Sequence, residues 1–183
     1  MNKNIILFLI LFTITGMVFA QEQFVTALDL VISKETLKSI SSWIWYNIWY
    51  KHDEDVWNKK DYWQSPEETL KLLSGDCEDF AILMWKCASI LDKKPKLMSI
   101  NYYKKFEKRC HMICLLGYSE SSDICYGYFD NNDGLILFNK GYKPSEVAKL
   151  LYDDWYLLKI WKKKENNNYK KYEGWKIQEY VYR

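Results

Sequence analysis

The stretch that decides the fold is SPEETLKLLSGDCEDFA, residues 65–81. A Ser, a following Pro and a Glu three positions after the Ser form the pattern of a capped helix start, so a short helix is predicted to begin at Ser65 and to stop at Gly75. A second helix is predicted from Cys77 to about Leu91, because its apolar residues recur at a spacing of three and four. Cys77 is therefore expected to be the first residue of a helix.

A cysteine at a helix start lies where its ionised form is favoured. The first N–H groups of a helix have no intrahelical partner, and the positive end of the helix dipole attracts an anion. Only the thiolate is a nucleophile, and a free cysteine has a pKa of ~8.5. Asp76, Glu78 and Asp79 act in the opposite direction, because nearby negative charge raises a thiol's pKa. Arg109, a lysine or a bound cation is expected to offset them.

The rest of the chain reads as one α+β domain, residues 21–183. Hydrophobic spacing predicts one or two helices before the decisive stretch and a long helix after the strands. The predicted elements are one or two helices in 24–50, a charged loop at 51–60, extended segments at 97–103, 111–118, 125–130 and 134–138, a helix at 144–161 and an edge strand at 174–182. The charged run 162–171 is expected to be solvated surface.

Two of the predicted strands form a hairpin that pairs a histidine with a carboxylate. A turn centred between Glu120 and Ser121 sets His111 opposite Asp130 on one face of the sheet, close enough for a hydrogen bond. With Cys77, the pair gives the Cys–His–acid arrangement of nucleophilic catalysis. His111 is expected to pair with the thiolate and protonate the leaving group, while Asp130 orients the imidazole and backbone N–H groups bind the oxyanion. The alternative is a structural cysteine beside a chance His–Asp pair.

These motifs resemble the transglutaminase-like superfamily of bacterial cysteine peptidases. The resemblance is carried by Tyr62–Leu70, by Gly75–Ala81, by His111 in Cys-His-Met-Ile-Cys and by Asp130 in Tyr-Phe-Asp-Asn, in the family's order. It covers roughly residues 57–138, the expected catalytic core. It implies a papain-like fold in which a catalytic Cys at a helix N-terminus packs on an antiparallel sheet that carries the His and the Asp. The implied triad is Cys77, His111 and Asp130.

The residues around the triad have two interpretations each. Asp76, Glu78 and Asp79 are expected to stabilise the helix N-terminus, and the resemblance offers calcium binding as the alternative, because some periplasmic relatives bind Ca²⁺ through acidic residues near this motif. No cofactor is otherwise expected. Gln64 and Trp63 each carry a side-chain N–H that could serve an oxyanion or the substrate, although a Trp at this place is more often part of the core.

Residues 1–20 have the form of a secretory signal peptide. A basic start, an apolar run and a small residue at position 20 precede the domain. The apolar run is short for a retained anchor, which needs ~20 residues. A secreted or periplasmic protein that is not membrane-bound after cleavage is therefore expected.

The cysteine count raises the question of disulfides in such a compartment. The chain has five cysteines, so at least one stays free. The predicted hairpin makes Cys114 and Cys125 diagonal neighbours, which allows a non-ideal bridge. Cys87 is expected in the core, and Cys110 cannot reach Cys114. Reduced thiols are the favoured interpretation.

Composition narrows the function. The chain is 49% hydrophobic with a net charge of only +2, so a packed domain is expected and nucleic acid is not an expected partner. The sequence predicts a monomeric exported cysteine hydrolase that attacks amide bonds in protein or peptide substrates, through an acyl-thioester that passes to water or to an amine. The alternative is a catalytically silent module that binds peptide or cell-wall material. Replacing Asp130 by Asn is expected to be mild, because an amide oxygen can still accept from the imidazole.

Overall fold

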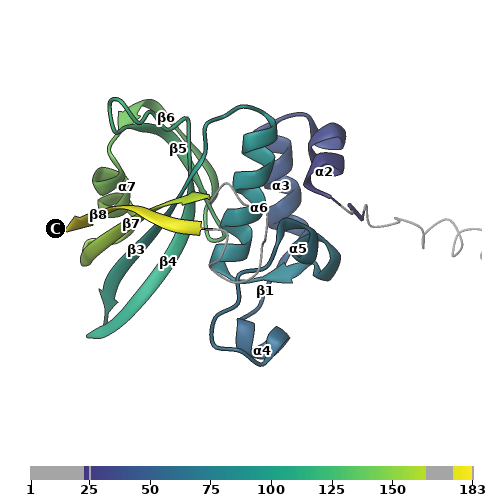
Figure 1. Cartoon of the computed structure of the whole chain (residues 1–183), viewed down its shortest axis with the longest axis horizontal. Helices are drawn as coiled ribbons and strands as arrows, with labels where there is room; N and C mark the ends of the chain where they lie inside the picture. Colours follow the sequence, from purple (N-terminus) through teal and green to yellow (C-terminus); the bar gives the residue numbers. More distant parts are fainter. Residues whose placement is uncertain (1–22, 25, 164–174, 183) are drawn as a thin grey trace, which may run out of the picture.

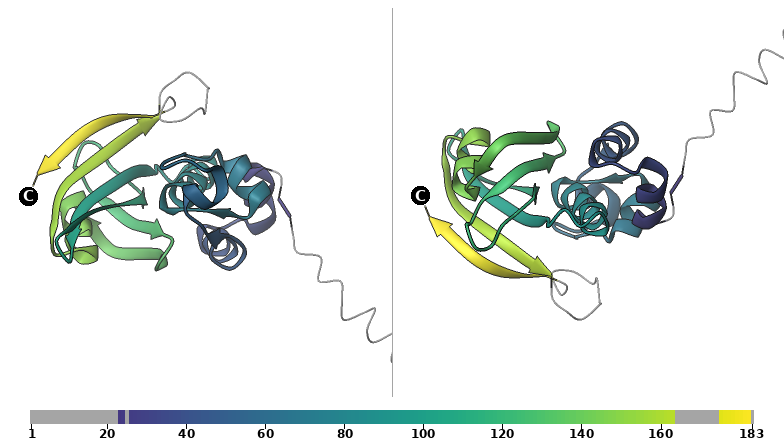
Figure 2. Two further views of the ribbon diagram at one scale, coloured as in Figure 1. Left: turned by 90° about the horizontal axis from the view of Figure 1, so that it is seen from below. Right: turned by 90° about the horizontal axis from the view of Figure 1, so that it is seen from above.

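A layer of helices packs on one face of an antiparallel sheet, and in the described part of the chain one further helix covers the other face (Figures 1 and 2). The computed structural model describes residues 23–24, 26–163 and 175–182. The predicted signal peptide and residues 164–171 of the charged run lie outside this range. No helix among the described residues has the length and apolar character needed to cross a membrane. The predicted α+β class is confirmed.

The helices lie mostly before the sheet in sequence. The described helices are α2 (Ala27–Lys34), α3 (Leu37–Asn47), α4 (Asp53–Trp57), α5 (Pro66–Leu72), α6 (Cys77–Ile90) and α7 (Pro144–Leu151). Ser65 caps α5 as predicted: its hydroxyl accepts from the Glu68 N–H at 3.1 Å, and the Glu68 carboxylate accepts from the Ser65 N–H at 2.7 Å.

A six-stranded sheet has the order β6-β5-β4-β3-β7-β8, and a two-stranded parallel ladder joins β1 to β2. The strands are β1 (Trp49–Tyr50), β2 (Ser74–Gly75), β3 (Lys96–Lys104), β4 (Glu107–Leu116), β5 (Cys125–Asp130), β6 (Gly134–Tyr142), β7 (Trp155–Lys163) and β8 (Trp175–Tyr182). The predicted strands and the edge strand at the C-terminal end are confirmed.

The sheet separates two hydrophobic clusters. Side chains alternate across a strand, so Met112 and Cys114 of β4 pack with α2, α3 and α6, whereas Ile113 and Leu115 pack with α7 and β7. Cys87 is fully buried in the first cluster, as predicted. All five cysteines are unpaired. Cys114 and Cys125 do not form the disulfide that the sequence allowed, because Cys125 belongs to the second cluster, across the sheet from Cys114.

Two secondary-structure predictions need correction. The helix expected over 144–161 ends at Leu151, and Trp155–Lys163 forms β7, which pairs with β3 and β8. Trp155, Leu158 and Ile160 are buried in the second cluster and Trp161 packs against the first, so pairing within the sheet outweighs the helical spacing. The charged loop 51–60 contains the short helix α4.

The predicted register of β4 and β5 is also wrong. Cys114 pairs with Phe129 and Leu116 with Gly127, and the pairing centres between Ser121 and Ser122. Each partner is therefore shifted by two residues. Because side chains alternate with a period of two, a shift of two leaves His111 and Asp130 on the faces predicted for them. Cys125 is an exception: it lies on the other face from the one predicted, and β5 is irregular between Cys125 and Gly127. The ladder ends at Cys114, so β4 and β5 diverge towards His111.

Candidate active site

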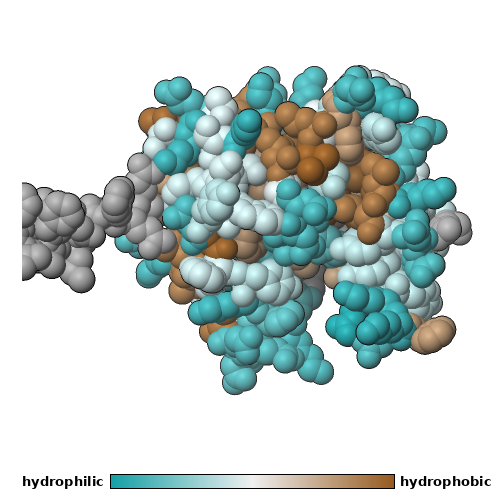
Figure 3. All heavy atoms as spheres, turned by 180° about the vertical axis from the view of Figure 1, so that it is seen from behind, coloured by the Kyte–Doolittle hydropathy of each residue, from teal (hydrophilic) through white to brown (hydrophobic). Residues whose placement is uncertain are grey.

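A cleft of about 960 Å³ separates the α4 segment from the β3–β4 hairpin. The cleft is lined by Tyr50, His52 and Asp61 on the α4 side and by Tyr102 and Arg109 on the hairpin side. Figure 3 shows the hollow from behind, between two hydrophilic lobes at the lower edge of the molecule. Cys77 and His111 both line it.

The position of Cys77 follows from the residues just before it. Trp49 pairs with Ser74 and Tyr50 with Gly75, which ties the start of α6 to the segment that follows α3. A Cβ on Gly75 would lie 2.6 Å from the Asp79 side chain. Only glycine allows this approach, so the turn presents Cys77, half-buried, as the first residue of α6.

Asp79 holds this turn together. Its carboxylate accepts hydrogen bonds from the Gln64 backbone N–H at 2.7 Å, the Gln64 side-chain amide at 2.8 Å and the Asp76 N–H at 3.1 Å. The Gln64 amide also donates to the Ser74 carbonyl at 3.2 Å. Both amide hydrogens of Gln64 thus have partners, and Gln64 is buried outside the cleft lining. This geometry gives Gln64 a structural role, and its side chain has no N–H left to donate to an oxyanion.

Trp63 lines the cleft and packs edge-on against Trp161, with ring centroids 5.0 Å apart. It is 6% exposed. The side chain therefore belongs to the core, as the more common interpretation expects, and also forms part of the cleft wall.

The Cys77 thiol donates to the Glu78 carboxylate at 3.1 Å, not to His111. Burial raises the pKa of the Cys77 thiol well above its ordinary value, and the charges of Glu78 and Asp76 raise it further. The favourable end of the helix dipole is outweighed here. In this arrangement Cys77 is a protonated thiol.

His111 and Asp130 form the predicted pair. His111 Nε2 lies 3.2 Å from Asp130 Oδ2, and both side chains are buried. Asp130 Oδ1 accepts from the N–H groups of Asn132 at 2.7 Å and Asp133 at 2.6 Å. Burial raises the pKa of Asp130, but the hydrogen bonds from His111 and these N–H groups more than compensate and hold it below its ordinary value. Asp130 is an anion fixed against the imidazole.

Three tyrosines lie around His111 and Cys77. The sequence offered Tyr102 as a residue of either a cleft or the core, and it did not suggest Tyr50 or Tyr152. Tyr152, after α7, lies edge-on to His111 with ring centroids 5.9 Å apart and stacks on Tyr102 at 3.8 Å. Tyr50 lines the cleft beside Cys77. Burial raises the pKa of both Tyr50 and Tyr152 above the ordinary value. No local pattern marks these residues, since long-range pairing brings them together.

An acidic cluster lies behind the thiol. Carboxylate oxygens of Asp53, Asp76 and Asp79 lie within 4.8 Å of one another, as do those of Asp53, Asp61 and Glu78. Burial and mutual repulsion raise the pKa of Asp76 to about 9 and of Asp79 to about 8. Burial raises the pKa of Glu78 to about 7. Asp53, buried in the loop predicted to be merely charged, is an addition that the sequence did not suggest.

No protein-family model and no curated protein matches the sequence. Among solved structures, Legionella pneumophila LapG (EGTA-treated) aligns over 72% of this chain and 71% of its own, with 21% identity and a TM-score of 0.42. A second structure of Legionella pneumophila LapG aligns over 67% of this chain and 81% of its own, with 22% identity and a TM-score of 0.38. The interpretation of the site therefore rests on its own geometry.

Proposed function

We propose that this protein is a cysteine peptidase of the transglutaminase-like type, with Cys77 as nucleophile, His111 as general base and acid, and Asp130 as the group that orients the imidazole. The observation that carries the proposal is the buried hydrogen-bonded pair of His111 and Asp130. His111 lines the same cleft as Cys77, which is the first residue of α6. A thiol at a helix start beside an oriented imidazole is the arrangement that nucleophilic catalysis requires.

The proposed reaction uses the two nitrogens of His111 differently. Nε2 faces Asp130, so Nδ1 is left to accept the Cys77 proton once the thiol turns from Glu78. The thiolate then attacks the substrate carbonyl carbon, and the oxyanion is stabilised by N–H groups at the start of α6. Collapse breaks the C–N bond as the imidazolium protonates the leaving amine. Water, deprotonated by His111, hydrolyses the thioester and frees Cys77.

The acidic cluster fits a calcium ion. We propose that Asp76, Glu78 and Asp79 bind this ion and that Asp53 is an additional ligand. Buried oxygens Asp53 Oδ1 and Asp76 Oδ1 have no hydrogen-bond partner in the described structure, and several carboxylate oxygens are the donor set that Ca²⁺ prefers. A bound cation would neutralise the carboxylates that raise the Cys77 pKa. Calorimetric titration with Ca²⁺ and melting curves test this: Asp79→Ala should lose the stabilisation and the exposed Asp55→Ala should keep it. Absence of any calcium effect on the wild type contradicts it.

The proposal also covers the compartment in which the enzyme acts and the molecule that accepts the acyl group. A leader at residues 1–20 would place a monomeric enzyme outside the cytoplasm, where it would act on protein or peptide substrates. The near-balanced charge of the chain argues against nucleic acid as a partner. Water and an amine are both chemically competent to take the acyl group from Cys77. A catalytically silent module that binds peptide or cell-wall material is the second candidate, favoured by the cleft but not by an oriented His–Asp pair.

The deciding experiment is digestion of a proteome-derived peptide library, read by mass spectrometry, with wild type and Cys77→Ala. New termini are expected with wild type alone. Incorporation of a fluorescent primary amine at glutamine, in parallel, identifies acyl transfer. If folded wild-type protein gives neither new peptide termini nor amine-labelled glutamine, with and without calcium, the enzyme is excluded and the binding module is supported.

A further inference from the structure

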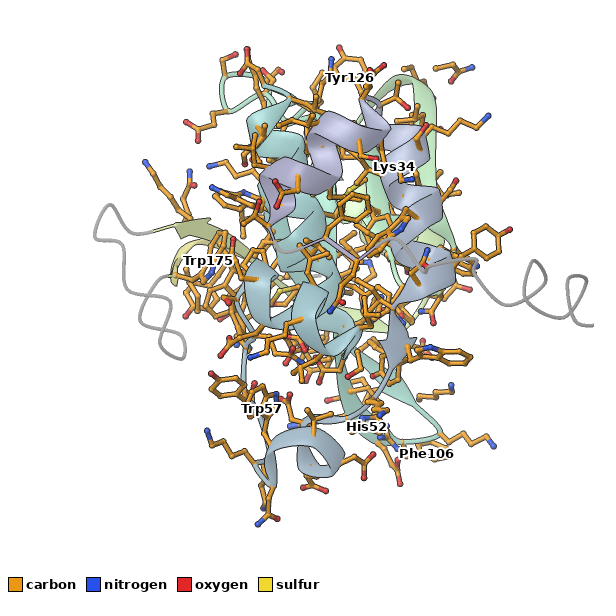
Figure 4. All side chains as sticks on the ribbon, turned by 90° about the vertical axis from the view of Figure 1, so that its right-hand side faces the viewer. Lys34, His52, Trp57, Phe106, Tyr126 and Trp175 are labelled. Atoms are coloured by element: carbon orange, nitrogen blue, oxygen red, sulfur yellow. The ribbon has the colours of Figure 1, made fainter. Side chains whose placement is uncertain are left out.

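The β3–β4 hairpin projects from the sheet beside the cleft, at the same end of the molecule as α4 (Figures 1 and 4). Its two turn residues, Lys105 and Phe106, have φ values of 51° and 70°. A two-residue turn with both φ positive favours Asn-Gly, because bulky side chains are strained there. Phe106 is nonetheless fully exposed at the tip. A strained aromatic without packing indicates a segment retained for contact with something else.

The hairpin is rich in positive charge and supplies two of the four lysine and arginine residues that line the cleft, Lys104 and Arg109. Residues 104–109 read KKFEKR, four basic residues and one acidic, in a chain whose net charge is only +2. All six are exposed. Charges of one sign on a cleft wall raise the local concentration of ligands of the opposite sign. This wall therefore attracts anions.

The basic wall is continuous with the candidate active site. Tyr102, Lys104 and Arg109 line both the main cleft and an adjoining hollow of about 450 Å³ along the hairpin. Arg109 lies two residues before His111 on β4, so both side chains are on the same face. Tyr102 pairs with Arg109 across the ladder and stacks on Tyr152. Contacts thus run from Arg109 to the imidazole.

Arg109 already holds a carboxylate in this position. Its guanidinium forms an ion pair with Glu107, and both side chains are more than half exposed. An exposed pair of this kind adds little stability, so an incoming carboxylate can replace Glu107. Arginine is suited to this exchange, because its planar fork binds a carboxylate through two parallel hydrogen bonds.

We infer that Arg109 and Lys104 form a substrate subsite for an acidic residue, so that peptides with Asp or Glu near the scissile bond are preferred. The inference deepens the proposed function and rests on it for turnover. The occupant is the anionic side chain of an extended peptide, held over Tyr102. Glu107 takes its place when no substrate is bound.

The first test needs no turnover. Rates of Cys77 alkylation by iodoacetate and by iodoacetamide, which differ by one negative charge, are measured site by site by mass spectrometry at alkaline pH. The iodoacetate-to-iodoacetamide ratio is expected to fall about tenfold in Arg109→Gln and to fall with added salt. Arg109→Lys should retain part of it, and Lys149→Gln on α7, away from the cleft, should leave it unchanged. An equal ratio in wild type and Arg109→Gln overturns the inference.

The second test uses the peptide library. Acidic residues should be enriched around wild-type cleavage sites, and the sites that Arg109→Gln cleaves should lack that enrichment. Cleavage without enrichment overturns the subsite and leaves the peptidase intact. No cleavage at all refutes the peptidase, while the alkylation ratio still decides whether the wall binds carboxylates. The inference would also be overturned if the protein sediments with phosphatidylglycerol vesicles, Phe106→Ser abolishes this sedimentation, and the iodoacetate-to-iodoacetamide ratio is the same in wild type and Arg109→Gln. The hairpin would then be a membrane contact.

Discussion

Replacing Asp130 by Asn tests whether the triad works as its hydrogen bonds suggest. Asp130 Oδ1 accepts from two backbone N–H groups, and Oδ2 faces His111 Nε2. An amide has one acceptor oxygen, which must stay with the backbone N–H groups because an NH₂ group cannot accept from them. The NH₂ group then faces Nε2, so the imidazole proton must move to Nδ1. In that tautomer His111 cannot take the Cys77 proton.

The expected loss in kcat/KM is therefore about 10³- to 10⁴-fold. The corresponding substitution in a serine-protease triad, which leaves the wrong tautomer, lowers kcat about 10⁴-fold. This loss corresponds to about 4–5.5 kcal/mol of transition-state stabilisation. The structure changes the expectation drawn from the sequence, in which the Asn oxygen was free to accept from the imidazole. Here the turn at Asn132 and Asp133 occupies that oxygen.

The assay is kcat/KM on the most rapidly cleaved library peptide, beside a melting curve for each variant. Asp133→Asn is the matched control, because it removes the same charge from the same turn while its backbone N–H still donates to Asp130. Asp133→Asn should retain wild-type turnover. A loss of less than tenfold in folded Asp130→Asn would refute the tautomer argument.

Three further outcomes are expected. Glu78→Gln should lower the Cys77 pKa, seen as a shift of the pH profile of iodoacetamide labelling to lower pH, because a charge that raises it is removed. Without calcium, the melting temperature should fall as the pH rises from 5 to 8. Glu78 and Asp79 have pKa values of about 7 and 8 in the folded protein, above those in the unfolded chain, so their protonated forms stabilise the fold fully below the unfolded-state pKa values and this stability is lost as the pH rises. A melting temperature that does not change with pH would contradict this. Gly75→Ala should reduce the free energy of unfolding in urea by about 1–3 kcal/mol, because its Cβ meets Asp79; an unchanged midpoint would show that the turn can relax.

Local sequence patterns predicted what local interactions decide. The cap at Ser65 and the helix start at Cys77 depend on residues within one turn, and both formed as predicted. His111 and Asp130 met although the register was wrong, because an even shift preserves the face of each strand. Face is determined by alternation, whereas register also depends on turn length.

Long-range pairing explains what the sequence could not predict. Trp155–Lys163 has spacing compatible with a helix and becomes a strand because β3 and β8 lie on either side of it. Tyr50 and Asp53 lie near the start of α6 because β1 pairs with β2, two strands of only two residues each. Strands so short leave no periodicity to recognise. Tyr152 likewise comes from the connection after α7, where no motif marks it.

The five unpaired thiols have a consequence for the chemistry of the surroundings. A protein held by disulfides needs an oxidising medium, whereas a sulfur nucleophile is lost to oxidation in that medium. This fold depends on buried apolar side chains and places no disulfide among its structural supports. Reductant can therefore protect Cys77 without loosening the chain, and the same protein can be produced where glutathione keeps thiols reduced.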